Sequence, residues 1–157
     1  MLISRQTAVI GSSSWLRKDA EWSINPGDPS AAQFSILDQL EGMDRPPDNK
    51  FFFELYWPEL EGTEKGPRQL WKQSSNPVLA VSKADVDDYE AVDAPYTSGW
   101  GGLQRSGSSA LLDGSSCPRC HRGEWWYSVG TRSFYSSRFM PGPPPEAVSQ
   151  TELVTRV

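Results

Sequence analysis

The segment Phe51–Trp57, with the sequence FFFELYW, constrains the fold more than any other stretch of this chain. Its alternate positions form one apolar face: Phe51, Phe53, Leu55 and Trp57. Period-two alternation with many aromatic residues is typical of a β-strand with one buried face. The other face carries Glu54, which indicates contact with water, and Pro58 ends the strand because proline has no N–H for the ladder. The segment therefore predicts a sheet with a core on one side.

The rest of the chain contains further strand-sized runs, separated by turn clusters rich in Gly, Pro, Ser and Asn. We predict strands at Thr7–Ile10, Gln33–Leu40, Gln69–Gln73, Val78–Val81, Trp125–Val129 and Ala147–Val154. No segment makes a convincing amphipathic helix, and 13 Gly with 13 Pro favour short strands and frequent turns. These features predict an all-β protein with a β-sandwich or jelly-roll-like fold. We expect a single domain over residues 1–157, with 1–14 and 141–157 as peripheral segments.

The length and charge of the chain disfavour several classes of protein. A chain of 157 residues is expected to form one core. The formal net charge is −5 and no basic stripe is present, which disfavours nucleic acid as a partner. No run approaches the roughly 18 apolar residues that a membrane span needs. The N-terminal apolar run is short and broken by Gln6 and Thr7, so it makes a poor signal peptide.

The segment Ser98–Gly130 combines the most unusual residues of the chain. It begins with a Trp-Gly-Gly turn, passes a short apolar run and a loop with both cysteines and the only histidine, and ends in an aromatic run. The simplest interpretation is two antiparallel strands joined by this loop.

Several short sequences follow one another after Phe51. They are WKQSSNP (Trp71–Pro77), YEAV (Tyr89–Val92), WGGL (Trp100–Leu103), ALLDGS (Ala110–Ser115), WWYSVG (Trp125–Gly130) and VSQTEL (Val148–Leu153). This order resembles β-rich modules of large extracellular proteins from marine invertebrates and unicellular eukaryotes. The resemblance implies a secreted or surface module of adhesive or glycan-binding type. The two cysteines and the histidine are not part of it.

Four residues are the candidate ligand-binding set: Trp100, Trp126, Tyr127 and Asp113. An aromatic ring with a polar edge suits the apolar face of a sugar, and an aspartate can bind its hydroxyl groups. Strand alternation sends Trp125 and Tyr127 to one face and Trp126 to the other, and one face must be core. The alternative is therefore that most of these rings are core residues.

The motif Cys117-Pro118-Arg119-Cys120-His121 matches the C-x-x-C-H pattern of covalent haem attachment, with Met140 as the second axial ligand. A redox role for the two thiols is disfavoured, because the motif lacks the βαβ surroundings that are usual for a redox dithiol. Structural zinc is disfavoured because it needs four ligands and at most three are near. The flanking Gly, Ser and Arg residues favour a solvated hairpin loop in which Cys117 and Cys120 could close a local disulfide. We predict no haem and no metal here, and no cofactor for the chain.

Acidic residues suggest two further sites, each with a simpler alternative. Asp85, Asp87, Asp88 and Glu90 could supply oxygen ligands to calcium, but their spacing lacks the EF-hand glycine and terminal glutamate, so a solvated acidic loop is preferred. Glu54 and Glu124 could form a carboxylate pair for glycoside chemistry, although sequence spacing does not show it. We do not expect an enzyme.

These observations predict a non-enzymatic recognition or adhesion module that binds a glycan or glycoprotein. We expect it outside the cell or at the cell surface, or else in an organelle lumen. The first alternative is a structural subunit docked against neighbouring subunits of a larger assembly, because ends rich in Gly, Ser and Pro usually fray unless a partner holds them. A c-type haem protein is the second alternative.

Overall fold

A computed structural model describes residues 1–7, 23–64, 66–79, 88–94, 100–105, 112–115 and 148–156 of the chain. These residues form nine strands, whose pairings are all antiparallel, and two short 3-10 helices. The prediction of an all-β fold is confirmed.

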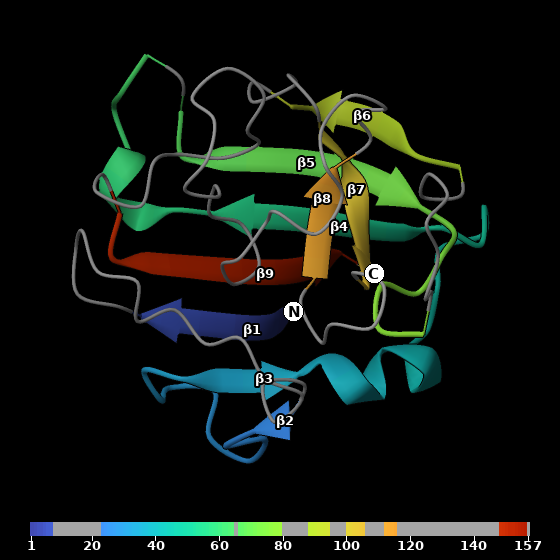
Figure 1. The fold of residues 1–157 in the computed structure, drawn as a ribbon, viewed down its shortest axis with the longest axis horizontal. Helices are drawn as coiled ribbons and strands as arrows, with labels where there is room; N and C mark the ends of the chain where they lie inside the picture. Colours follow the sequence, from blue (N-terminus) through green and yellow to red (C-terminus); the bar gives the residue numbers. More distant parts are fainter. Residues whose placement is uncertain are drawn as a thin grey trace.

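Seven of the strands make one sheet in the order β2-β3-β1-β9-β4-β5-β6 (Figure 1). Their bounds are Leu2–Thr7 (β1), Ser23–Ile24 (β2), Phe34–Ile36 (β3), Phe51–Tyr56 (β4), Arg68–Gln73 (β5), Glu90–Asp93 (β6) and Gln150–Arg156 (β9). The other two, β7 (Trp100–Arg105) and β8 (Leu112–Ser115), form a separate two-stranded sheet. The strands predicted at Phe51–Trp57 and Gln69–Gln73 are confirmed, whereas Trp125–Val129 lies outside the described residues.

The first and last strands of the chain lie at the centre of the large sheet, so the expectation that both ends are peripheral is wrong for residues 2–7 and 150–156. β1 pairs with β9 from Leu2↔Val154 to Thr7↔Gln150, and β9 pairs with β4 on its other side. The Thr155 amide also donates to the Met1 carbonyl at 2.9 Å. The physical reason is that each strand has neighbours on both sides, which satisfies its backbone groups.

One face of the large sheet, the inner face, carries the hydrophobic core. Its fully buried side chains include Phe53, Leu55 and Trp57 of the β4 region, and Trp71 of β5. The 3-10 helix η2 (Leu37–Gly42) adds two more core residues, and burying each large apolar side chain contributes about 1.5–3 kcal/mol. The alternation predicted for Phe51–Trp57 is confirmed by this core.

The two-stranded sheet lies across the large one, with its strands at a steep angle to β4 and β5 in Figure 1. Buried Leu103 of β7 joins the core, and the Gln73 side chain of β5 bonds to the backbone of Leu103. Within the described residues the second layer holds these two strands. The sandwich or jelly-roll subclass therefore stays a prediction.

Two of the predicted strands differ in the structure. Within Gln33–Leu40, Phe34–Ile36 is a strand and Leu37 begins η2, since a 3-10 helix has three residues per turn and so buries two leucines three positions apart. Val78 and Leu79 lie in a turn because the Asn76 carboxamide oxygen accepts from the Val78 amide at 2.9 Å.

Candidate ligand-binding site

The face of the large sheet opposite the core, the outer face, carries three cross-strand rows of side chains. The register gives Arg156–Phe52–Lys72, then Val154–Glu54–Leu70, then Arg5–Glu152–Tyr56–Arg68. Side chains directly opposite on neighbouring strands touch, and diagonal neighbours are within reach of long side chains. The rows therefore form one continuous polar and aromatic surface over β1, β9, β4 and β5.

Glu54 is buried at the centre of this surface, with a relative exposure of 7%. The face around it meets water as predicted, since the side chains of Arg68 and Arg156 are about half exposed. Arg156 contacts its Oε2 through Nη2 at 2.6 Å and Nε at 3.0 Å, and Arg68 Nε lies 3.2 Å from its Oε1. Two long side chains from the flanking strands cover the carboxylate, which compensates for its lost hydration. Both oxygens are engaged, which fits a structural anchor; the Glu124 of the predicted pair lies outside the described residues.

Two half-buried aromatic rings flank Glu54 on the same strand. The Phe52 ring has the Arg156 guanidinium carbon 5.6 Å and the Lys72 Nζ 5.9 Å from its centroid. The Arg68 guanidinium carbon lies 5.4 Å from the Tyr56 centroid. These are cation–π distances, so the cations hold the two rings in place.

The Tyr56 hydroxyl group extends this surface toward the loop after β4. It donates to Glu61 Oε1 at 3.0 Å. Loss of hydration and the nearby Glu61 carboxylate raise the pKa of Tyr56, so the phenol stays protonated and able to donate. The half-buried ring thus has the Arg68 guanidinium over it and a fixed polar edge at its hydroxyl group.

Arg68 and Arg156 keep hydrogen-bonding capacity in spite of their ion pairs with Glu54. Their side chains are 48% and 47% exposed. A guanidinium has five N–H donors in a planar fork, and the contacts to Glu54 occupy only part of them. Both residues can therefore bind an additional acceptor from solution.

Lys72 is held by Asp48 at the end of the first row. The distance from Lys72 Nζ to Asp48 Oδ2 is 2.7 Å. This hydrogen bond raises the pKa of Lys72 and lowers the pKa of Asp48, for which the Lys50 amide adds a further bond. The pair is charged across the physiological range.

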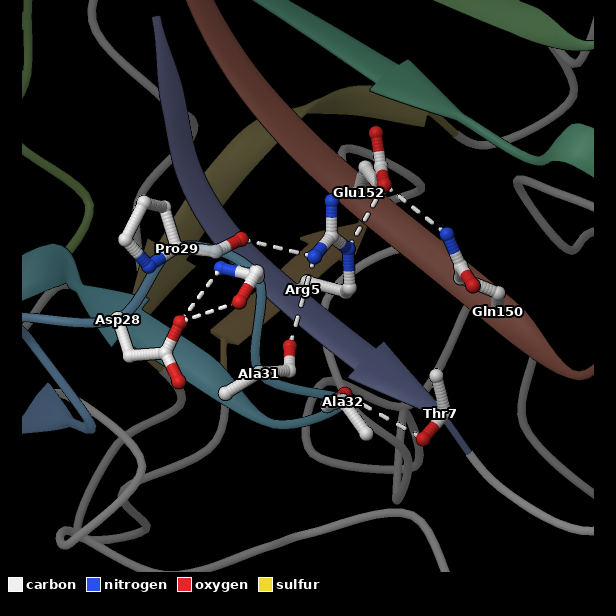
Figure 2. Close-up of polar contacts among 9 residues, drawn as sticks. Arg5, Thr7, Asp28, Pro29, Ala31, Ala32, Gln150 and Glu152 are labelled. Carbon is white, nitrogen blue, oxygen red and sulfur yellow. Dashed lines mark hydrogen bonds and ion pairs between the residues drawn. The ribbon is translucent and has the colours of Figure 1, made fainter.

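Arg5, at the other end of the third row, has a structural role (Figure 2). Its Nε donates to Glu152 Oε1 at 2.8 Å and its Nη1 donates to the carbonyls of Pro29 at 2.8 Å and Ala31 at 3.4 Å. Gln150 donates to the same Glu152 oxygen at 2.9 Å. These bonds tie the 28–32 loop to β1 and β9, so the accessible donors lie on the other half of the surface. We call that half the outer patch, consisting of Phe52, Glu54, Tyr56, Arg68, Lys72 and Arg156.

The predicted ligand-binding set is only partly described. Trp100 lies in β7 and Asp113 in β8, on neighbouring strands, where Trp100 pairs with Ser115 and Asp113 pairs with Gln104. Trp126 and Tyr127 lie outside the described residues, as do Cys117 and Cys120 and the haem candidates His121 and Met140. The structure thus places two of the four expected residues on one small sheet.

Sequence reasoning missed the outer patch. The signal was present in the strongest predicted strand, because Phe52 and Tyr56 flank Glu54 on the face opposite the core. Two aromatic residues on the face away from the core indicate a second surface for packing or binding.

The calcium candidates do not form a site within the described residues. Asp88 lies in a turn with φ of 53°, and Glu90 lies in β6, 3.2 Å from Lys50 Nζ. Asp85 and Asp87 fall outside the described part of the chain. Nowhere in that part do three His, Cys, Asp or Glu side chains gather so that they could hold a metal ion.

Comparisons with known proteins find no match to a family model, a curated protein or a solved structure. The resemblance to extracellular β-rich modules therefore stays a prediction. In the described part of the chain, no helix has the length and apolar character to cross a membrane.

Proposed function

We propose that this chain is a non-enzymatic extracellular recognition or adhesion module that binds a glycan through the outer patch. One observation carries the proposal. Phe52 and Tyr56 present half-buried rings in register with the half-exposed guanidiniums of Arg68 and Arg156. Rings beside charged groups suit a saccharide, whose C–H face packs on an aromatic ring while its hydroxyl groups bind polar side chains.

The charge balance of the outer patch favours a neutral glycan over a polyanion. The patch has three cations, and three carboxylates accompany them: Glu54 with Arg68 and Arg156, Asp48 with Lys72, and Glu61 on Tyr56. The local formal charge is therefore zero, and that of the whole chain is −5. A sulfated or phosphorylated polymer would gain little from long-range attraction to this surface.

A glycan array with neutral and acidic saccharides, run with and without calcium, tests the proposal. We expect the full chain to bind neutral saccharides independently of calcium. The double variant Phe52→Ala/Tyr56→Ala should weaken binding by about tenfold or more, because truncating central aromatic residues removes much of the contact energy. The control Val92→Ala changes an exposed residue of β6 and should bind like the natural chain. The proposal would be contradicted if the natural chain bound no saccharide on the array, or if the double variant bound as well as the natural chain.

The alternative of a subunit docked in a larger assembly has lost one of its reasons. That reason was the expected fraying of both ends of the chain. Residues 2–7 and 150–156 are instead paired with each other inside the sheet. If the natural chain bound nothing on the array, a structural subunit of a larger assembly would still be the better hypothesis.

A further inference from the structure

Three buried oxygen atoms have no hydrogen-bond partner among the described residues. They are Gln6 Oε1, Gln33 Oε1 and Thr151 Oγ1. The Gln6 residue is 4% exposed and Thr151 is 2% exposed. Leaving a buried polar atom unbonded costs about 1–3 kcal/mol, so three such atoms call for a physical explanation.

The three atoms belong to neighbouring positions on three adjoining segments. Gln6 of β1 pairs directly with Thr151 of β9. On the other side of β1, Arg5 pairs with Phe34, so the register brings Gln33 opposite Gln6. The Gln33 Nε2 donates to the Thr7 carbonyl at 2.6 Å, which holds its side chain at the end of β1.

This row lies on the inner face of the sheet, away from the outer patch. Thr151 alternates with Glu152 of the outer face, and it shares the inner face with buried Leu153 two positions further along β9. The row is thus a site separate from the proposed glycan surface, and either can exist without the other.

The hydrogen-bonding groups of this row determine which kind of ligand can bind to it. The two carboxamide oxygens can only accept, and the threonine hydroxyl can donate. The buried polar residues of the inner face are neutral: Ser4, Gln6, Ser35, Gln69, Gln73, Thr151 and Thr155. A cation would lose its hydration here and meet only these neutral groups, so the ligand should be neutral.

We propose that the row Gln33–Gln6–Thr151 binds an internal water molecule. The water donates to Gln6 Oε1 and Gln33 Oε1 and accepts from Thr151 Oγ1. Buried waters typically make about three hydrogen bonds to polar groups that otherwise lack partners. This water would link the residue before β3 to β1 and β9 at the place where the first and last strands of the chain meet.

Nuclear Overhauser contacts between water and the isotope-labelled full chain test the proposal. We expect contacts from a long-lived water to the side-chain amide of Gln6 and to the methyl group of Thr151. Gln6→Met should remove the contact at Thr151, and Thr151→Val should weaken the contact at Gln6. The matched control is Thr155→Val on the same strand, whose hydroxyl already donates to the Phe52 carbonyl at 3.3 Å, and it should leave both contacts unchanged.

Three results would overturn this assignment. The first is a folded natural chain with no water contact at Gln6 or Thr151. The second is a loss of both contacts in Thr155→Val. The third is a crystal structure of the full chain in which protein donors bond the Gln6 and Gln33 oxygens. The glycan array does not depend on any of them, so the two proposals fail independently.

Discussion

The side-chain amide of Gln73 pairs with the backbone of Leu103 as a strand would: Gln73 Nε2 donates to the Leu103 carbonyl and Gln73 Oε1 accepts from the Leu103 amide, both at 2.9 Å. The same Oε1 accepts from Trp71 Nε1 at 2.8 Å. Gln73 is fully buried. This single side chain therefore joins β7 to the large sheet and satisfies polar groups inside the core.

Replacing Gln73 with methionine should destabilise the protein by about 2–4 kcal/mol, because the Leu103 amide and the Trp71 indole lose a buried acceptor. Denaturant unfolding measures the loss, and hydrogen exchange at the Leu103 amide should accelerate. Gln150→Met, on the outer face, is the control and should change the unfolding free energy by less than about 1 kcal/mol. Equal stabilities of Gln73→Met and the natural chain would refute this role.

Replacing Glu54 with leucine leaves Arg68 and Arg156 without their shared carboxylate. We expect a loss of about 1–3 kcal/mol, below the cost for a fully buried pair because both arginines are half exposed. Urea unfolding of Glu54→Leu and of Glu61→Leu, which changes an exposed carboxylate, provides the comparison. A gain in stability on Glu54→Leu would show that the carboxylate is not a structural anchor.

Two adjacent residues of β9 test its central position in the sheet. Leu153 is 1% exposed on the inner face, whereas Val154 belongs to the outer face. Leu153→Ala should cost about 2–5 kcal/mol through lost burial and the cavity left behind. Val154→Ala should cost clearly less in the same unfolding experiment. Similar small costs for both would mean that β9 is peripheral after all.

The pair Asp48–Lys72 predicts part of the acid sensitivity of the protein. The Lys72 hydrogen bond lowers the pKa of Asp48 below its ordinary value of 3.8. A carboxylate with a lowered pKa in the folded state stabilises the protein above its unfolded pKa, and this contribution is lost as the pH falls through the folded pKa. In thermal unfolding measured from neutral pH to strong acid, the melting temperature of Asp48→Asn should therefore fall less steeply, below the ordinary pKa of aspartate, than that of the natural chain. Superimposable pH profiles would contradict the prediction.

The central strand of the core could be predicted from the sequence because its alternation is local. Phe51–Trp57 shows its period within seven residues. The pairing of β1 with β9 joins residues from opposite ends of the chain, and no local pattern reports such a contact. The ion pairs of Glu54 likewise depend on strand order, since Arg68 and Arg156 come from the two strands that flank it.

The buried polar residues also could not be predicted from local sequence patterns. Gln73 ends a predicted strand, where a glutamine ordinarily faces water. Its burial becomes understandable only when Leu103 of β7 supplies a donor and an acceptor. The chemistry of Trp100 and Asp113 predicts ligand residues, and the structure places both on the β7–β8 sheet.

The most direct measurement is amide nuclear magnetic resonance of the full chain during titration with the neutral glycan that binds best on the array. Binding through the outer patch should shift the amide signals of Phe52, Tyr56, Arg68 and Arg156, and Phe52→Ala/Tyr56→Ala should suppress the shifts. Shifts confined to Trp100–Arg105 and Leu112–Ser115, with the outer-patch signals unmoved at saturation, would contradict the assignment of the glycan site to the outer patch.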